Sequence, residues 1–171
     1  MQQSKRAAGD VFVECNGQQV RIRRGLFYTT DHMWAEATPE RQVRTGVTDY
    51  AQRFLREPVS LVTVERSQTT EPDIRNGEKF GTIFGRYNRV TGSREYGCTA
   101  FDLVTPVTGR IADVNDKVMD RPELINRDPY GDGWIALVDV FDVQSCCRGL
   151  ITHDGYKRTV ADRRQSRFRE I

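Results

Sequence analysis

The chain has 171 residues, of which 37% are hydrophobic and 29% are charged, and its formal net charge at pH 7 is +2. A chain of this length fits one domain with added segments, since single domains commonly contain roughly 100–150 residues. No apolar run approaches the roughly 20 residues that a membrane-spanning helix needs, and residues 1–10 lack the apolar segment of a secretory signal. We therefore expect no membrane span and a location in the cytoplasm or the mitochondrial matrix.

The types of basic and sulfur-containing residues limit the possible chemistry. The only lysines are Lys5, Lys79, Lys117 and Lys157, and arginine supplies the rest of the 26 basic residues. Any function that needs a primary amine on a side chain therefore has few possible positions. The cysteines, which form no C-x-x-C pair, are Cys15, Cys98, Cys146 and Cys147. We expect free thiols and no metal site.

The first predicted element is a hairpin within an N-terminal extension over residues 1–26. Residues 11–15 and 18–23 are β-prone and flank Asn16-Gly17, a pair that favours tight hairpin turns because both positions need positive φ. Further along the chain, strands are predicted before residue 37, over 42–47 and over 59–65. A short helix is predicted over 50–55, after the helix-capping pair Thr48-Asp49.

The second half of the chain also favours strands, over 80–87, 96–104, 110–114 and 134–143. One helical turn is expected at 121–125, where Pro122 suits the first helical position. Residues 144–171 are predicted to be an Arg-rich C-terminal extension, with a helix that docks on a partner protein. Docking through Phe168 and arginines is favoured over nucleic-acid binding, because the tail also contains acidic residues and only Tyr156 and Phe168 for stacking.

Four stretches of the chain resemble the glycine cleavage system H-protein family. Residues 28–34 are similar to Y-T-x-D-H-E-W, with Met33 in place of the acidic residue, and 46–55 are similar to G-I-T-D-Y-A-Q-x-x-L. Residues 106–115 resemble P-V-S-G-x-V-x-x-x-N, and 122–134 resemble the long pattern P-x-L-[IV]-N-x-D-P-Y-G-x-G-W. The resemblance implies a mainly β fold, the lipoyl/biotinyl-type barrel-sandwich hybrid with short helices, over residues 27–143.

The family's chemistry implies a carrier without catalytic activity of its own. In the family, a hairpin presents one lysine that carries lipoate. The lipoyl group takes an aminomethyl group from the pyridoxal-phosphate P-protein and passes it to the folate-dependent T-protein, and the flavoprotein L-protein reoxidises the dithiol. This cycle needs a primary amine on a long side chain at the hairpin tip.

The chain departs from the family at that lysine. The family's hairpin reads E-S-V-K-A-x-S-D-L-Y-S-P, and counting back from Pro106 places Cys98 at the lysine position, with Glu95 and Asp102 flanking it. Residues 84–94 then form an insertion between the preceding strand and this hairpin.

No other placement of the gap supplies an amine, because no lysine lies between Lys79 and Lys117. A guanidinium group cannot take the place of lysine in the lipoyl amide. We therefore predict a non-lipoylated H-protein-like subunit that acts as a protein-interaction or structural component of a larger assembly. It would have no catalytic residues, no bound cofactor and no metal.

Two alternatives remain open at this point. Cys98 could act as a thiol or sulfur carrier, which requires an exposed thiolate, although a small, partly buried residue is the favoured interpretation. The chain could also be an accessory protein related to glycine cleavage.

Other polar residues in the matched stretches have simpler interpretations. His32 and Trp34 are predicted to lie in the core, and Asp49, Glu95 and Asp102 are predicted to be solvated surface carboxylates. Cys146-Cys147 could be redox-active together with Cys15, but packing at strand ends is favoured.

Overall fold

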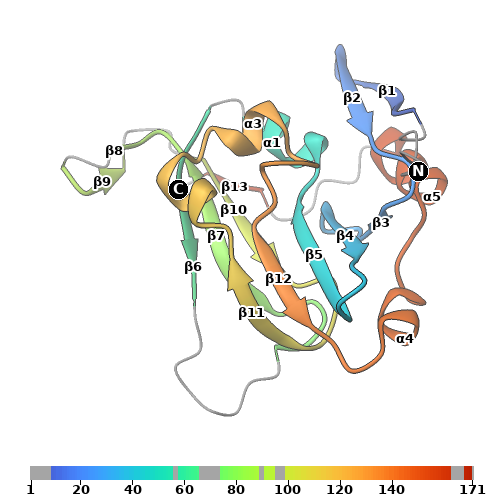
Figure 1. Ribbon diagram of the computed structural model, residues 1–171. Helices are drawn as coiled ribbons and strands as arrows, with labels where there is room; N and C mark the ends of the chain where they lie inside the picture. Colours follow the sequence, from blue (N-terminus) through green and yellow to red (C-terminus); the bar gives the residue numbers. More distant parts are fainter. Residues whose placement is uncertain are drawn as a thin grey trace, which may run out of the picture.

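Two antiparallel sheets face each other in the computed structural model (Figure 1), which describes residues 9–55, 58–65, 74–88, 91–94, 99–162 and 168–170. The five-stranded sheet has the order β11 (Arg110–Val114), β12 (Ala136–Asp139), β5 (Gln42–Val47), β4 (Met33–Ala37) and β3 (Phe27–Tyr28). The four-stranded sheet has the order β13 (Phe168–Glu170), β10 (Thr99–Val104), β7 (Lys79–Gly85) and β6 (Val59–Val64). The mainly β fold class predicted from the sequence is therefore confirmed.

The main core lies between the two sheets. It contains Met33 and Val47 from one sheet and Ile83, Phe101 and Leu103 from the other, all fully buried. Alternate residues of a strand point to the same face, so each sheet contributes one row of apolar side chains. Three short helices add residues to this core or lie beside it: α1 (Asp49–Phe54), α2 (Asp116–Asp120) and α3 (Leu124–Arg127).

The predicted start of α1 is confirmed at Thr48. The Thr48 side chain accepts a hydrogen bond from the backbone N–H of Ala51, and Asp49 lies in the first turn. Both features stabilise a helix N-terminus, because its first N–H groups have no partner within the helix and its dipole favours a negative charge.

The predicted N-terminal hairpin is also confirmed. Strands β1 (Val11–Cys15) and β2 (Gln18–Ile22) pair across a turn in which Asn16 and Gly17 both have positive φ, 51° and 75°. The inner side of the hairpin packs with α5 (His153–Ala161) in a second core cluster that includes Tyr28, Tyr130 and Tyr156. Figure 1 shows the hairpin and α5 on the same side of the molecule.

Several boundaries differ from the sequence predictions. The strand predicted over 134–143 ends at Asp139, because Asp142 caps a further helix, α4 (Val143–Cys147), that was not predicted. Helix α2 was also not predicted. The strand predicted from residue 96 begins at Thr99, and residues 95–98 lie outside the described residues.

The C-terminal segment differs from the predicted docking extension. Its helix exists as α5, but Tyr156 is fully buried in the protein's own core and is not available for stacking on a partner. Beyond the helix, β13 pairs with β10, with Phe168 opposite Phe101. Part of the segment therefore completes the four-stranded sheet.

In the described part of the chain, no helix is both long and apolar enough to cross a membrane.

Candidate functional site

The connection between β7 and β10 is the segment in which the resemblance predicts the hairpin that carries the family's lysine. The two strands pair in an antiparallel register, with Phe84 opposite Ala100 and Thr82 opposite Asp102. Past Gly85, a second pair of strands, β8 (Tyr87–Asn88) and β9 (Ser93–Arg94), continues outward as a two-stranded ribbon. Figure 1 shows this ribbon projecting from the body of the molecule.

The position of the predicted insertion can be compared with these strands. Phe84 and Gly85 belong to β7 and pair with β6, so the segment predicted over 84–94 begins inside a strand of the sheet. Its remaining described residues form β8, β9 and part of the turn between them, where Gly92 has a φ of 66°. The described part of the β7–β10 connection therefore contains a two-stranded ribbon at the place where the resemblance predicts the hairpin.

Two of the predicted site residues, Cys98 and Glu95, lie outside the described residues, and Cys98 directly precedes β10 in the sequence. Asp102 is described, and it is not a solvated surface carboxylate. It is buried, and its Oδ1 lies 3.0 Å from the Nζ of Lys79. The prediction for Asp102 was wrong because the cross-strand lysine supplies a partner that allows burial.

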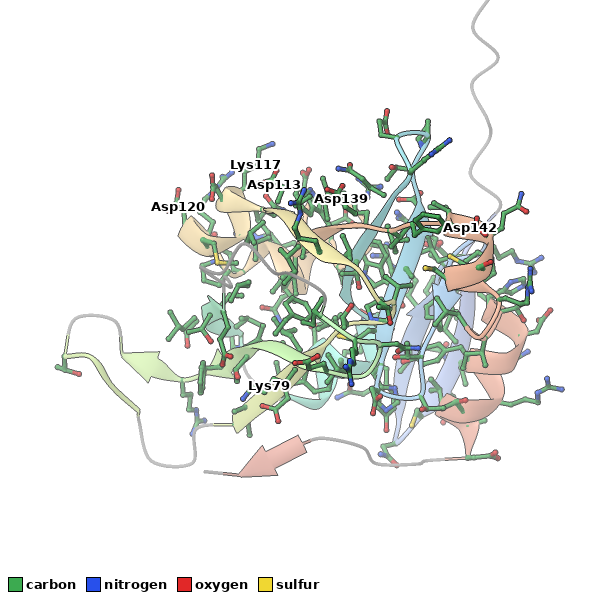
Figure 2. The ribbon with its side chains drawn as sticks, turned by 90° about the horizontal axis from the view of Figure 1, so that it is seen from below. Lys79, Asp113, Lys117, Asp120, Asp139 and Asp142 are labelled. Carbon is green, nitrogen blue, oxygen red and sulfur yellow. The ribbon has the colours of Figure 1, made fainter. Side chains whose placement is uncertain are left out.

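Neither of the two nearest lysines lies on the β7–β10 connection. Lys79 is the first residue of β7, at the end of the strand opposite to the ribbon. Seven residues at roughly 3.3 Å each separate the ends of this strand by about 20 Å. Lys117 belongs to α2 (Figure 2), on the far side of the β10–β11 turn in the sequence.

Met33 replaces the acidic residue of the family's Y-T-x-D-H-E-W pattern. It is fully buried in the main core among apolar residues of both sheets. A carboxylate in this apolar cluster would require a buried partner or protonation. The substitution therefore removes a polar group from the interior.

His32 and Trp34 both lie in the core, as predicted. His32 is fully buried, and its Nδ1 lies 2.8 Å from the hydroxyl of Tyr156, which also lies 2.7 Å from the Thr48 hydroxyl. Burial raises the pKa of Tyr156 well above its ordinary value, so its hydroxyl stays protonated and can act as a donor. Trp34 is also fully buried and donates from its indole Nε1 to the carbonyl of Pro129, at 2.9 Å.

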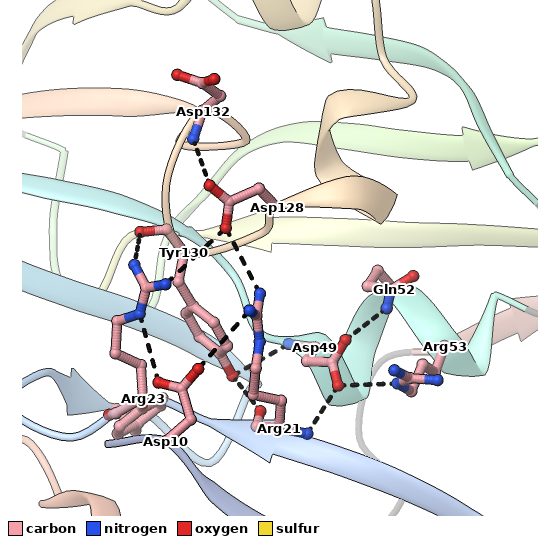
Figure 3. Close-up of polar contacts among 10 residues, drawn as sticks. Asp10, Arg21, Arg23, Asp49, Gln52, Arg53, Asp128, Tyr130 and Asp132 are labelled. Atoms are coloured by element: carbon pink, nitrogen blue, oxygen red, sulfur yellow. Dashed lines mark hydrogen bonds and ion pairs between the residues drawn. The ribbon is translucent and has the colours of Figure 1, made fainter. Parts of the chain in front are cut away.

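A polar network joins the N-terminal hairpin to two of the family-like stretches (Figure 3). The guanidinium groups of Arg21 and Arg23 lie 5.5 and 5.6 Å from the ring centre of Tyr130, and both pair with Asp10 and Asp128. The Tyr130 hydroxyl donates to the carbonyl of Arg21, at 2.8 Å, and accepts from the backbone N–H of Asp49, at 3.2 Å.

Asp49 is the second predicted surface carboxylate that is in fact buried. It accepts hydrogen bonds from the backbone of Arg21 at 2.7 Å, from Gln52 at 2.7 Å and from Arg53 at 2.8 Å. The prediction failed because the hairpin, far away in the sequence, covers this carboxylate. Sequence reasoning also missed the roles of Arg21 and Arg23. Their alternation along a predicted strand indicated a shared face, but not what that face contacts.

The described cysteines are free thiols in packed positions. Cys15 is buried, and its thiol lies 3.7 Å from the carbonyl of Val160. Cys147 is buried in α4, and desolvation raises the pKa of its thiol. A raised pKa lowers the thiolate fraction and hence the reactivity, which favours the packing interpretation over the redox one.

These contacts have a structural rather than a catalytic character. The tyrosines whose pKa is raised by burial, including Tyr130 and Tyr156, lie in a packed interior and not in a cleft. Within the described ranges, no group of three or more His, Cys, Asp or Glu residues could hold a metal ion. Two facing antiparallel sheets, one of which carries an extended β7–β10 connection, define a barrel-sandwich protein of the lipoyl-domain class.

Comparisons with known proteins identify the family within this class. The family model described as "Glycine cleavage H-protein" matches residues 26–163. The chain belongs to the glycine cleavage H-protein family. The matched span extends past residue 143, so α4 and α5 fall within it.

Individual relatives agree with this assignment. The glycine cleavage system H protein of Coprothermobacter proteolyticus is 31% identical over 143 residues, which cover 84% of this chain and 100% of the relative. The probable glycine cleavage system H protein of Aeropyrum pernix is 34% identical over 154 residues, covering 90% and 95%. The crystal structure of a glycine cleavage system H protein from Mycobacterium marinum has a TM-score of 0.60 at 28% identity, covering 79% of this chain and 95% of that one.

Proposed function

We propose that this chain is an H-protein family member that does not carry lipoate and acts as a protein-interaction subunit of a larger assembly. The observation that supports this most directly is the composition of the β7–β10 connection. No lysine lies between Lys79 and Lys117, so this connection contains no primary amine to which lipoate could be attached.

The two flanking lysines are poor substitutes. Lys79 forms an ion pair with buried Asp102 at the end of β7 away from the ribbon, about 20 Å from its other end. Modification of Lys79 would remove the positive charge that pairs with the buried carboxylate of Asp102. Lys117 is exposed, but it lies in the first turns of α2 rather than on a hairpin.

The elements outside the sandwich support an interaction role. The hairpin β1–β2 and the ribbon β8–β9 both add structure around a retained core. A protein whose role is to contact other proteins is expected to retain its fold even when it has lost the carrier residue. By membership of its family, the proposed assembly is related to the glycine cleavage system.

The alternative, a thiol or sulfur carrier that uses Cys98, stays a prediction, since this residue lies outside the described positions. Its test is mild alkylation of the folded protein, followed by intact-mass analysis. A Cys98 that resists labelling in the native state excludes the carrier role, whereas selective labelling of Cys98 favours it over the interaction role.

Three measurements test the proposed function. The intact mass of the protein isolated from its source cells should equal that of the unmodified chain. Purified protein incubated with lipoate–protein ligase and lipoate should also gain no mass, while a family member that has the lysine serves as the positive control. A gain of one lipoyl group on Lys79 or Lys117 would contradict the proposal.

Native size analysis should place the protein in a larger complex, and a chain that is always monomeric in its source cells would also contradict the proposal.

A further inference from the structure

The outer face of the five-stranded sheet, which points away from the main core, is covered at one end only. At the covered end, Trp34 of β4 is opposite Gly46 of β5 and is fully buried under the loop that contains Pro129. Two residues further along β4, Glu36 is opposite Arg44, and this pair is partly exposed. Because alternate residues share a face, Trp34 and Glu36 mark the covered and open halves of one surface.

The open half forms a shallow hollow with an apolar centre. The hollow has a volume of about 420 Å³ and is lined by Trp134, Leu137, Ala37 and Pro39 together with polar residues of β4, β5 and the turn between them. Trp134 and Leu137 are only partly buried. Exposed apolar groups surrounded by polar ones are the arrangement found at the centre of protein interfaces.

Acidic groups predominate around this hollow. Glu36 and Glu40 line it together with one basic residue, Arg44, which forms an ion pair with Glu36. Glu40 is exposed and makes no ion pair with any residue that the structure describes. The net charge of the residues that line the hollow is therefore negative, and the Glu40 carboxylate can pair with a cation of another molecule.

The acidic character continues onto β11. Asp113 is opposite Leu137, and directly opposed residues of antiparallel strands lie on the same face. Asp139 is on this face too, where it pairs with Arg110 and accepts a hydrogen bond from Gln42. Figure 2 shows Asp113 and Asp139 on one side of the molecule and Lys79, from the other sheet, on the opposite side.

We propose that this open outer face, formed by Glu36, Glu40, Arg44, Asp113, Trp134 and Leu137, is the surface on which a basic element of a partner protein docks. A lysine or arginine of the partner would lie between Glu40 and the ring of Trp134, where a carboxylate and an aromatic face both attract a cation. An apolar partner residue beside it would cover Leu137. This inference rests on the proposed function, because it supplies the contact surface of the interaction subunit.

The shape of the hollow favours a protein over a small molecule as the occupant. Sites for small ligands usually enclose most of the ligand's surface, whereas this hollow lies on a sheet face that opens to solvent. A partner protein gains affinity from a broad surface with a few anchoring side chains, and the open outer face extends over four neighbouring strands, β4, β5, β12 and β11.

The test maps the contact in the native complex purified from the source cells. Zero-length carbodiimide cross-linking joins a carboxylate directly to a lysine amine that is in contact with it. We expect cross-links from Glu36, Glu40 or Asp113 to lysines of an identified partner. Cross-links confined to other faces would overturn the inference while leaving the proposed function intact, and absence of any complex would overturn both.

A pair of matched variants tests the same surface by affinity. The double variant Glu40→Lys/Asp113→Lys reverses two exposed charges on the open outer face, and Glu14→Lys/Asp162→Lys reverses two exposed charges on the hairpin and at the end of α5. With the partner identified by the cross-links, we expect at least a roughly tenfold weaker affinity for the first variant and less than about a twofold change for the second. Equal losses, or no loss, would overturn the inference. Circular dichroism and the melting temperature establish that both variants are folded.

Discussion

The side of the molecule that contains the hairpin β1–β2 agrees with the family's residue pattern, whereas the side that contains the ribbon β8–β9 departs from it. On the hairpin side, Asp49, Asp128 and Tyr130 of the family-like stretches are held by several hydrogen bonds and ion pairs each. On the ribbon side, the connection lacks lysine and contains a further pair of strands. The family-like stretches on the hairpin side therefore encode packing contacts, whereas the β7–β10 connection differs by its lack of lysine.

The largest expected effect is a restored carrier site on the ribbon side. Deletion of residues 84–94 joins Ile83 to Glu95, which reproduces the family's hairpin spacing, and Cys98→Lys then supplies the amine. We expect this variant to be fully modified by lipoate–protein ligase, as measured by intact mass.

The matched control is Cys98→Lys in the full-length chain, which supplies the amine but retains the ribbon. We expect little or no modification of this variant. Equal modification of the two variants would show that the missing amine alone prevents lipoylation and that the ribbon has no effect.

The next effect concerns the buried cluster on the hairpin side. Tyr156→Ala removes a ring that stacks on Tyr28, with centroids 4.5 Å apart, and a hydroxyl that contacts His32 and Thr48. We expect a loss of about 3–5 kcal/mol in the free energy of unfolding, as for other buried aromatic residues, measured by urea denaturation. Phe141→Ala is the control, because Phe141 is 99% exposed and should change stability by less than about 0.5 kcal/mol. Similar losses of unfolding free energy for Tyr156→Ala and Phe141→Ala would mean that α5 does not stabilise this cluster.

A smaller effect is expected at Asp49, where the hairpin meets α1. Asp49→Ala leaves the backbone N–H of Arg21 and the side chains of Gln52 and Arg53 without their acceptor. We expect a cost of about 2 kcal/mol. Glu40→Ala, at an exposed carboxylate in the β4–β5 turn, should be nearly neutral in the same denaturation experiment. A neutral Asp49→Ala would contradict the structural role given to this carboxylate.

The smallest effect is a pH dependence at α4. The Ser145 hydroxyl and the backbone N–H of Gln144 lower the pKa of Asp142 below its ordinary value of 3.8. Because the pKa is lower in the folded state, the stabilisation is present above the ordinary value and is lost as the pH falls through the folded value. An NMR titration of the Asp142 carboxyl carbon should show this, and Ser145→Ala should move the midpoint upward. An unchanged midpoint would mean that this hydrogen bond does not form in solution.

The local elements were predictable because short-range chemistry determines them. Asn16-Gly17 gave the hairpin turn, and Thr48 gave the start of α1. Elements without such local signals were missed. Strand β13 exists because β10 offers an edge to pair with, and α4 interrupts a β-prone run because Asp142 caps it.

The candidate site was predictable only in part. The absence of lysine between Lys79 and Lys117 follows from the residues alone. The burial of Asp49 and Asp102 does not, because their partners Arg21 and Lys79 are brought to them by the folded chain. An isolated carboxylate in a sequence gives no sign of whether a distant backbone N–H group, as for Asp49, or a distant cation, as for Asp102, will allow its burial.

The sequence by itself determined the family, the turn and capping signals and the lack of an amine on the β7–β10 connection, since these depend on residue types and their spacing. Only the tertiary structure decided that Arg21 of β2 and Arg23 just after it lie over the ring of Tyr130, that Lys79 is bound to Asp102 at the far end of β7, and that half of the outer sheet face is open. Those features depend on which segments come into contact when the sheets pack, and these contacts are between residues that are distant in the sequence.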